Sequence, residues 1–519
     1  MIISTNYIAY KKGEIMANNN KRAYISVSDK TNIEIAAKKL EKLGYEIIST
    51  GNTYNYLREQ GISATESSTI TGFSELLSGK VKSLHPEIFA GILANEKEIQ
   101  SLDFPPISVV IVNLYPFEAY VGKNTETETL IKNIDIGGVA LLRAGAKNYE
   151  NVIVITDKED YELDFENIDI KTRENLALKV FKRTSNYDNA IFNELNKNFN
   201  NEVENNNDFI NYSFNKVEEL RYGENPHQMA SLYNYGQKKL DYEILNGKAL
   251  SYNNIIDTTA ALNIASEFFD VNCATIIKHT NPCGVALGAT LEEAWDKALD
   301  CDPLSAFGGI VAFTKKVNLE IAKKLTAMFL EVVVAPDFDD DALEQLKTKK
   351  NLRVIKLNTT FEDYREYCNK EIKLTPFGAL IQDKDTKELD PATFKTVTKE
   401  KPTTEMIEDM VFAFKVAKHL KSNAIVIAKD LKTLGICGGQ TSRVGAVEIA
   451  LMRVTDSCKD AILASDGFFP ATDNITVAAQ HRIKGIIQPG GSIKDNEVIE
   501  LSDKLGLCMV TTGIRHFKH

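Results

Sequence analysis

Short apolar runs alternate with stretches of helical periodicity over the first two hundred residues of the chain. Runs rich in β-branched residues lie at 23–28, 45–50, 107–117 and 151–157, and each predicts a buried strand. Between the first two runs, residues 29–44 carry apolar side chains at helical spacing and end in a glycine. Alternation of this kind is typical of a doubly wound α/β domain on a parallel sheet, whose ligands bind beyond the carboxyl ends of the strands.

A polar, asparagine-rich stretch interrupts the alternation at residues 196–208. We predict a linker at 198–209 between an N-terminal domain, 21–197, and a C-terminal domain, 210–519. The C-terminal domain resumes the α/β pattern and is long for a single sheet, so we expect two α/β subdomains in it. Its predicted strands lie at 273–279, 308–314, 331–337, 423–430, 434–440, 483–492 and 507–513.

The bulk composition excludes several classes of protein. The formal net charge is -11 and the pI ≈ 5.4, whereas binding to a nucleic-acid backbone normally requires a basic face. The 7 cysteines include no C-x-x-C pair, which argues against disulfides or structural zinc and fits a reducing cytoplasm. No apolar run approaches the roughly 18 residues that a membrane span needs. The first lysine pair follows a weakly apolar start, the wrong order for a signal peptide, so residues 1–20 are predicted to be a disordered extension.

Polar side chains follow the first two predicted strands, at the points where helices are expected to begin. They are Ser28 and Lys30 of SVSDKT, and Ser49, Thr50 and Gly51 of STGNT. Free N–H groups at a helix start attract phosphate. A plain N-cap would explain either segment alone, but two such segments side by side favour one bound phosphate.

Charged and aromatic side chains collect in three further segments of the N-terminal domain. They are Lys80, Lys82 and His85 of SGKVKSLHP, Asn113 and Tyr115 of NLYPF, and Asp135, Arg143 and Lys147 of IDIGGVALLRAGAKNY. A solvated loop would account for the first lysines taken alone. An aspartate, a tyrosine and two lysines at the ends of elements suit a reaction that combines proton removal with loss of water.

The segment 274–284, ATIIKHTNPCG, places two basic side chains at the predicted end of a strand. The alternatives for Lys278 and His279 are nucleophile chemistry, a metal site, general-base chemistry or a hydrated strand end. A zinc deaminase requires H-x-E and P-C-x-x-C, and neither spacing is present here. Cys283 is expected to be a packed thiol. Because adjacent strand residues point to opposite faces, we expect TNPCG to break the strand into a loop from which both bases face one ligand.

An ordered set of motifs relates the chain to a known family. The motifs are SVSDKT, VKSLHP, NLYPF, NIDIGGVALLRAGAKN, LRYGENPHQ, LSYNN, KHTNPCG, DPLSAFGG, SNAIV, SDGFFP and QPGGS, from about residue 21 to the last residue. Together they resemble the bifunctional purine-biosynthesis family that joins an aminoimidazole carboxamide ribonucleotide formyltransferase to an inosine monophosphate cyclohydrolase. The resemblance implies an N-terminal doubly wound domain like methylglyoxal synthase and a C-terminal domain with a cytidine-deaminase-like fold.

For the N-terminal domain, the resemblance implies closure of the formylated ribonucleotide to inosine monophosphate with loss of water. The catalytic residues that it implies are Lys82, Tyr115, Asp135 and Lys147, with Lys147 as the proton-transfer group. Phosphate and base contacts are implied for Ser28, Lys30, Ser49, Thr50, Gly51, Lys80 and Asn113. Relatives commonly have arginine where this chain has Lys80, and a lysine neutralises phosphate without the bidentate fork.

For the C-terminal domain, the resemblance implies formyl transfer from 10-formyltetrahydrofolate, a co-substrate, to the 5-amino group of the ribonucleotide. His279 is implied as the general base, and Lys278 as the group that stabilises the oxyanion or carries a proton. Substrate contacts are implied for Arg221, Tyr222, Gly308, Glu331, Asn423, Arg443, Phe468 and Arg515, and folate contacts for Asp473 and Ser492. Many relatives read FPFRD where this chain reads FPATD, so an arginine and an aromatic side chain are missing beside the implied folate site.

The resemblance also implies a cytoplasmic homodimer whose transferase site is shared between subunits, with no zinc. Some relatives respond to monovalent cations, which no residue pattern here decides. Three alternatives remain: a zinc-type nucleotide deaminase, a non-enzymatic nucleotide sensor, and a relative that keeps one activity only. Retention of Lys82, Lys147, Lys278 and His279 argues against a sensor, because binding alone does not require them all. Loss of one activity would be expected to involve Lys80 or the FPATD segment.

Overall fold

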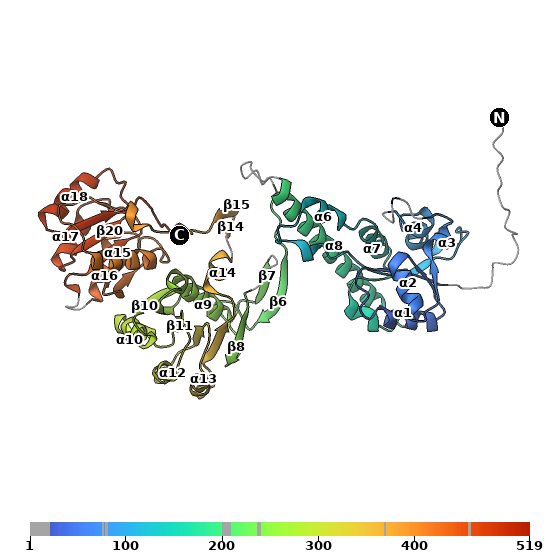
Figure 1. The fold of residues 1–519 in the computed structure, drawn as a ribbon, viewed down its shortest axis with the longest axis horizontal. Coiled ribbons are helices and arrows are strands. Elements are labelled where there is room, and N and C mark those ends of the chain that lie inside the picture. The colour runs from blue at the N-terminus through green and yellow to red at the C-terminus, as the bar shows by residue number, and fades with distance from the viewer. Residues whose placement is uncertain are drawn as a thin grey trace. The chain divides into compact units, whose positions relative to one another are not determined.

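The computed structural model describes residues 21–74, 77, 81–199, 209–235, 240–367, 370–454 and 458–519. The predicted extension at 1–20, Lys80 and most of the predicted linker lie outside these residues. Contacts within the chain divide it into unit 1, Met1–Ser213, and unit 2, Phe214–His519, which are described separately (Figure 1). None of the helices in the described part of the chain is long and apolar enough to cross a membrane.

Unit 1 contains a five-stranded parallel sheet in the order β3-β2-β1-β4-β5. The strands are β1 Arg22–Val27, β2 Glu46–Ser49, β3 Ala64–Glu66, β4 Ile107–Asn113 and β5 Ile153–Ile155. The helices are α1 Ile33–Lys42, α2 Gly51–Glu59, α3 Ser67–Thr71, α4 Pro86–Leu93, α5 Glu96–Ile99, α6 Thr127–Lys132, α7 Gly137–Lys147 and α8 Ile170–Phe199, with short 3-10 turns at Phe117–Tyr120 and Lys158–Glu162. The four strands predicted for this part of the chain are confirmed as β1, β2, β4 and β5.

Helices cover both faces of this sheet, because its strands are apolar on both sides. Side chains of α1 and α2, such as Ile33 and Leu57, pack on one face. Side chains of α4, α7 and α8, such as Ile88, Leu142 and Val180, pack on the other. Burial on both faces is what a parallel sheet requires, and it confirms the prediction of a doubly wound α/β domain.

Unit 2 contains a twelve-stranded mixed sheet in the order β16-β21-β20-β19-β17-β18-β10-β9-β11-β12-β13-β8. One half consists of β8 Tyr242–Asn246, β9 Asn272–Lys278, β10 Asn281–Gly288, β11 Ile310–Phe313, β12 Val332–Ala335 and β13 Arg353–Leu357. The other consists of β16 Lys395–Thr396, β17 Ile425–Lys429, β18 Lys432–Cys437, β19 Ile462–Ser465, β20 Gly485–Gln488 and β21 Cys508–Thr511. The seven strands predicted for this part are all confirmed.

The remaining elements of unit 2 are its helices and two separate hairpins. The helices are α9 Tyr252–Ala265, α10 Leu291–Cys301, α11 Pro303–Ala306, α12 Leu319–Thr326, α13 Asp340–Lys347, α14 Phe361–Glu366, α15 Thr404–Ala417, α16 Arg443–Met452, α17 Asp473–Gln480 and α18 Asp495–Lys504, with 3-10 turns at Ser266–Phe268 and Pro391–Thr393. The hairpins are β6 Phe214–Leu220 with β7 Ala230–Tyr235, and β14 Lys370–Thr375 with β15 Gly378–Asp383.

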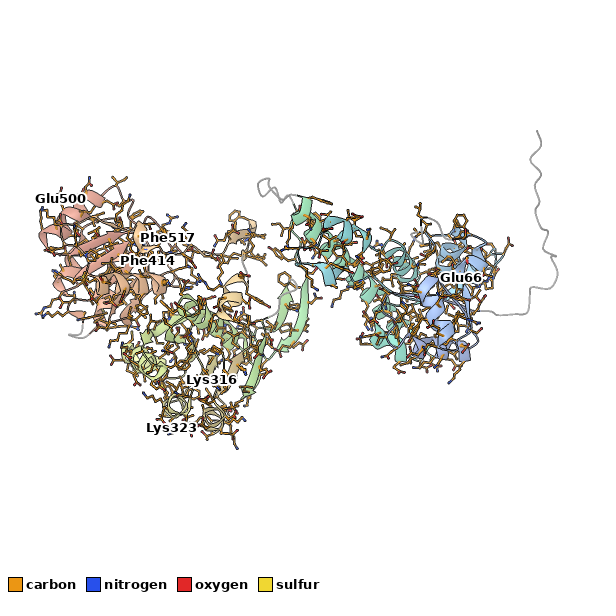
Figure 2. The ribbon with its side chains drawn as sticks, in the orientation of Figure 1. Glu66, Lys316, Lys323, Phe414, Glu500 and Phe517 are labelled. Carbon is orange, nitrogen blue, oxygen red and sulfur yellow. The ribbon has the colours of Figure 1, made fainter. Side chains whose placement is uncertain are left out.

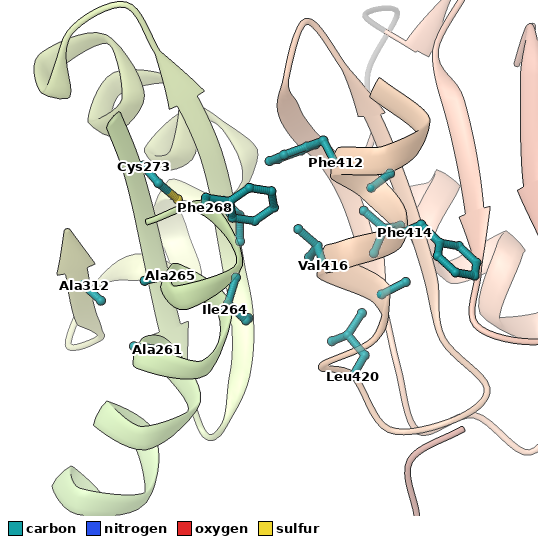
Figure 3. Close-up of a cluster of buried hydrophobic side chains, with 14 of the residues drawn as sticks. Ala261, Ile264, Ala265, Phe268, Cys273, Ala312, Phe412, Phe414, Val416 and Leu420 are labelled. Atoms are coloured by element: carbon teal, nitrogen blue, oxygen red, sulfur yellow. The ribbon is translucent and has the colours of Figure 1, made fainter. Parts of the chain in front are cut away.

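The strand order of the large sheet is symmetric about the contact between β10 and β18. Each half runs through an edge strand, a helix, a β-hairpin and then parallel strands joined by helices, so that α9 corresponds to α15 and α10 to α16. Helices α9 and α15 pack in one apolar cluster (Figure 3). In this cluster the ring centroids of Phe268, just beyond the end of α9, and Phe412 of α15 lie 5.3 Å apart. The predicted pair of α/β subdomains is therefore present, joined through one sheet.

Two glycines at corresponding positions allow the hairpins to pack against their helices. A Cβ added to Gly284, the fourth residue of β10, would lie 1.9 Å from the carbonyl oxygen of Ala298, the eighth residue of α10. A Cβ on Gly435, the fourth residue of β18, would lie 2.2 Å from that of Ala450, the eighth residue of α16. The same close approach is thus made in both halves.

We expect Gly284→Ala and Gly435→Ala each to destabilise unit 2, because the contacting atoms belong to backbone and neither helix can yield locally. Overpacking of this kind costs about 1–3 kcal/mol, which would lower the melting temperature of a unit of this size by about 2–6 °C. Thermal unfolding followed by circular dichroism measures the effect. Gly445→Ala in α16 is the matched control, since its nearest atoms lie at 3.6 Å. Equal melting temperatures for all three variants would contradict the prediction.

Candidate functional site

The carboxyl edge of the unit 1 sheet brings the predicted phosphate residues together. Asn113, the last residue of β4, accepts hydrogen bonds on Oδ1 from the N–H groups of Ser28, at 2.5 Å, and Asp29, at 3.0 Å. The helix predicted from residue 29 begins only at Ile33, after Asn32 in the left-handed conformation. The predicted start of the helix is therefore wrong: SVSDKT precedes α1, and the Asn113 side chain binds the N–H groups of Ser28 and Asp29.

The second polar segment has the geometry that was predicted for a phosphate site. Ser49 ends β2 and donates through Oγ to the carbonyl of Ile25 at 2.7 Å, while Thr50 immediately precedes α2. Gly51 opens α2 with a φ of 48°, and a Cβ there would lie 3.3 Å from Lys82 Nζ. A helix N-terminus with a lysine ammonium beside it attracts an anion. Lys30 Nζ donates to the Ser28 carbonyl at 3.2 Å on the same edge.

Asp135, Tyr115 and Lys82 form an interacting group beside this edge. Asp135 accepts a hydrogen bond on Oδ1 from the Gly138 N–H at 2.8 Å, at the start of α7. Burial raises the pKa of the Asp135 carboxyl, opposed by the N–H groups of Gly138 and Tyr115 and by the charge of Lys82. Burial and the Asp135 charge raise the pKa of the Tyr115 phenol. The group offers a carboxyl, a phenol and a cation, which together can transfer protons and stabilise an oxyanion.

Lys147 lies at the far end of α7 from this group. Ten residues separate it from Gly137, which corresponds to about 15 Å along a helix axis. The neighbouring Asn148 donates to the carbonyls of Ile92, at 2.8 Å, and Ala94, at 3.0 Å, at the end of α4. That end of α4 lies near Ile107, the first residue of β4, so Lys147 is exposed at the amino edge of the sheet. Within one chain, Lys147 and Asp135 therefore lie at opposite ends of α7 and are not in contact.

One edge of the unit 2 sheet carries the predicted transferase residues. The end of β9, the starts of β10, β11, β12 and β17, and the ends of β18, β19, β20 and β21 all meet there, as the strand pairings require. The first half contributes Lys278, His279, Gly308 and Glu331, and the second contributes Asn423, Arg443, Phe468, Asp473, Ser492 and Arg515. About 19 Å, or four strand spacings, separates β9 from β19 along the sheet.

His279 lies in a two-residue turn between β9 and β10. His279, with a φ of 53°, and Thr280, with a φ of 63°, are the two central residues, as in a type I′ hairpin. The left-handed conformation costs L-residues about 1–2 kcal/mol each, and a β-branched residue adopts it rarely. The expectation that TNPCG forms a loop is wrong, because Asn281–Gly288 is strand β10. Because His279 lies in this turn, its side chain need not follow the alternating directions of side chains along a strand.

Lys278 is fixed by the segment that contains Gly308. Its Nζ donates to the carbonyl of Phe307 at 2.8 Å, and the rings of Phe307 and Phe329 lie 5.4 Å apart. Gly308 has a φ of 75° and donates to the Phe329 carbonyl at 2.8 Å. Cys283 is buried, and burial raises the pKa of its thiol to about 12, so it is a packed thiol rather than a thiolate nucleophile.

The first turns of α9 connect three of the predicted segments. Asn253 donates to the Glu224 carbonyl at 3.3 Å, beside the loop in which Arg221 stacks on Tyr222 at 5.6 Å. Asn254, which is buried, donates to Glu331 Oε2 at 2.8 Å. The Asp257 carboxylate accepts the N–H of Thr280 at 2.7 Å. Sequence reasoning missed Asn254 and Asp257, because only tertiary contact shows their partners.

In the second half, two arginines flank the ring of Phe517. The guanidinium of Arg443 lies 5.9 Å from the ring centroid of Phe517, the residue labelled in Figure 2, and that of Arg515 lies 4.3 Å from it. Arg443 is buried and donates to Asp466 and to Ser465 Oγ, the latter at 2.8 Å. Arg443 thus holds the loop after β19 in place, while Arg515 is more accessible to an anion.

The other residues predicted for the second half lie on loops of the same edge. Asn423 donates through its side chain to the Gln440 carbonyl at 2.8 Å. Phe468 is half-buried next to the core residue Phe469. Asp473 begins α17 and is exposed, and Ser492 accepts the N–H of Lys494 at 3.1 Å. These residues share an edge with Lys278 and His279 but lie in the other half of the sheet.

Comparison with known proteins gives a consistent set of relatives. The family model described as AICARFT/IMPCHase bienzyme matches residues 145–453, and the MGS-like domain model matches residues 32–140. Proteins called bifunctional purine biosynthesis protein PurH are 46% identical in Persephonella marina and 47% identical in Caldicellulosiruptor saccharolyticus, each over 96% of this chain and 100% of the relative. A solved structure described as "Crystal structure of ForH" is 31% identical and covers 34% of this chain and 97% of its own, with a TM-score of 0.30.

Proposed function

Because the chain belongs to the AICARFT/IMPCHase bienzyme family and is a bifunctional transferase and hydrolase of purine biosynthesis, we propose which residues carry each of its two reactions. The first reaction transfers a formyl group from 10-formyltetrahydrofolate to the 5-amino group of aminoimidazole carboxamide ribonucleotide. The second closes the product to inosine monophosphate with loss of water. The observation that carries the proposal is the placement of Lys278 and His279 at one sheet edge and of Lys82, Tyr115 and Asp135 at another.

The formyl transfer is assigned to unit 2. The 5-amino nitrogen attacks the formyl carbon and His279 takes the proton from that nitrogen. The tetrahedral oxyanion then collapses, and the bond to the folate nitrogen breaks as that nitrogen receives the proton from His279, which releases tetrahydrofolate. Lys278 stabilises the oxyanion, because its ammonium is held by the Phe307 carbonyl next to Gly308. The turn conformation of His279 separates its side chain from the strand and leaves it exposed to a ligand.

The ring closure is assigned to unit 1. The carboxamide nitrogen attacks the formyl carbon, and a hydroxyl on that carbon then leaves as water. Lys82 neutralises the oxygen that becomes charged, and Asp135 and Tyr115, whose pKa values are both raised, exchange the protons. The nucleotide phosphate binds at the start of α2, beside Gly51 and Lys82. Lys147 is too far along α7 to contact Asp135, Tyr115 or Lys82 of the same chain. A role for Lys147 in proton transfer would therefore require a second copy of the chain or a rearrangement of α7.

The transferase site is proposed to be shared between two copies of the chain. Lys278 ends β9, and Arg443 binds Asp466 in the loop after β19, but four strand spacings, about 19 Å, separate these two strands. A second copy that presents its C-terminal half to the first would bring both groups to one nucleotide and one folate. A cytoplasmic homodimer with these two small-molecule substrates is therefore the expected working form.

A coupled assay tests the proposal directly. The purified chain is supplied with the ribonucleotide and 10-formyltetrahydrofolate, and tetrahydrofolate and inosine monophosphate are measured together. We expect both to appear in equal amounts. Accumulation of formylated nucleotide would instead point to loss of ring closure, with Lys80 as the first residue to restore to arginine. Closure of supplied formylated nucleotide without any formyl transfer would direct attention to FPATD.

The same assay separates the alternatives. A zinc-type deaminase would release ammonia from a nucleotide with no formyl donor present, and its activity would fall on chelation of zinc. A pure sensor would bind nucleotide and give no product. The absence of the H-x-E and P-C-x-x-C spacing around His279 and Cys283 argues against the deaminase.

A further inference from the structure

The turn that carries His279 is held by a carboxylate from a neighbouring helix. Asp257, the sixth residue of α9, is half-buried and accepts the N–H of Thr280 at 2.7 Å, and the N–H of His279 also hydrogen-bonds to it. These are the two residues with positive φ in the turn. A single anionic side chain therefore binds both N–H groups that the left-handed conformation directs to one side.

The second half of unit 2 contains the same arrangement without a histidine. Asp409, the sixth residue of α15, accepts the N–H of Asp430 at 3.1 Å and of Leu431 at 2.7 Å. Asp430 and Leu431 form the turn between β17 and β18, with φ values of 53° and 56°. The duplicate turn lies at the opposite edge of the sheet, away from the predicted transferase residues. The fold thus provides a matched pair, one turn with the predicted base and one without it.

We infer that Asp257 is a positioning residue for formyl transfer, which sets the orientation of the His279 side chain by fixing its turn. This inference rests on the proposed role of His279. The direction of the His279 Cα–Cβ bond follows from the backbone angles of the turn, so loss of the carboxylate would let a strained turn relax and move the imidazole. Displacement of a catalytic group by about 1 Å can cost about a hundredfold in rate.

The neighbouring contacts of α9 strengthen the inference. One helical turn before Asp257, Asn254 donates a hydrogen bond to Glu331 at 2.8 Å. The first two turns of α9 thus bind Glu331, a predicted substrate contact, and the turn that carries His279, the predicted base. Asp409 has no such pair of predicted site residues beside it among the described part of the chain.

The test compares Asp257→Ala, Asp257→Ala with Thr280→Gly, and Asp409→Ala in the full-length chain. We expect Asp257→Ala to lower kcat for formyl transfer about 10–100-fold with little change in the KM for the ribonucleotide. Glycine at the second turn position favours a type I′ turn without help, so Thr280→Gly should restore a large part of the lost kcat. Asp409→Ala should lower thermal stability and leave the kcat of formyl transfer unchanged.

Two further measurements make the outcomes unambiguous. Closure of supplied formylated nucleotide should be unaffected by Asp257→Ala, which shows that unit 1 is intact, and an unchanged circular dichroism spectrum shows that unit 2 is folded. Hydrogen exchange of the 272–288 segment should increase in Asp257→Ala and return in the double variant, and this readout needs no activity. Unchanged exchange, or changed exchange with an unchanged kcat, would overturn the positioning role. An unaltered chain without any formyl transfer would instead overturn the proposed function, while exchange would still report on the turn.

Discussion

His279→Ala is expected to reduce formyl transfer by about 10²–10⁴-fold, the usual contribution of a general base. The 5-amino group is a weak nucleophile because its lone pair is delocalised toward the carboxamide, so it needs a base as it attacks. His279 is the exposed imidazole of the β9–β10 turn, next to a lysine that is held by the Phe307 carbonyl. Release of tetrahydrofolate, followed by absorbance with ribonucleotide present, measures the loss.

Ring closure provides the internal control for this variant. Supplied formylated nucleotide should still close at the normal rate, because Lys82, Tyr115 and Asp135 belong to the other unit. His279→Asn is a second useful variant, since asparagine tolerates the left-handed conformation and keeps the turn while removing the base. If His279→Asn retained full formyl transfer, the general-base assignment would be wrong.

Lys82→Ala is expected to lower ring closure by about 10²–10³-fold, as loss of one preorganised oxyanion donor does elsewhere. Lys82 Nζ lies near the start of α2, and its charge acts on the Asp135 carboxyl. Its removal would therefore take away a positive charge beside the proposed phosphate site and beside the formyl oxygen that becomes negatively charged in the reaction. The rate of inosine monophosphate formation from formylated nucleotide measures the loss. Formyl transfer should be unchanged in the same protein.

Lys147→Ala is the informative companion to Lys82→Ala. From its place at the amino edge of the sheet, we expect a smaller loss of ring closure than Lys82→Ala gives. An equal loss in a folded protein would mean that proton transfer uses a group that one chain does not place beside Asp135. In that case a second copy of the chain, or a rearrangement of α7, would have to supply it.

Local pattern was sufficient to predict that both units are α/β and to locate most of the buried strands of their sheets. Strands such as β4 and β12 are short, apolar and β-branched, and helices such as α1 have apolar residues at helical spacing, so burial alone specifies them. Helix starts were less certain: SVSDKT resembles the start of a helix, yet Asn113 binds the N–H groups of Ser28 and Asp29, and α1 begins at Ile33. A side chain from a residue 85 positions away in the chain thus binds the segment that the local pattern assigned to the helix start.

The site was predictable where its residues follow strand ends and unpredictable where they meet across elements. The carboxyl ends of parallel strands share an edge, which is why the segments that contain Ser28 and Ser49 were expected side by side, as the pairing of β1 with β2 places them. Lys147 and Asp135 lie close in sequence, but an intervening helix carries them to opposite edges. The sequence of α9 gives no local signal for the contact between Asp257 and the turn of His279.

The amino-acid sequence by itself determined the two α/β units, most of the buried strands in their sheets and the set of motifs that relates the chain to its family. It did so because hydrophobic periodicity and short motifs are local properties. Tertiary structure alone decided that the two halves of unit 2 share one sheet, that His279 lies in a strained two-residue turn, and that Asp257 holds it. The physical reason is that hydrogen bonds between distant elements depend on how the sheet and its helices pack, and residue spacing along the chain does not specify that packing.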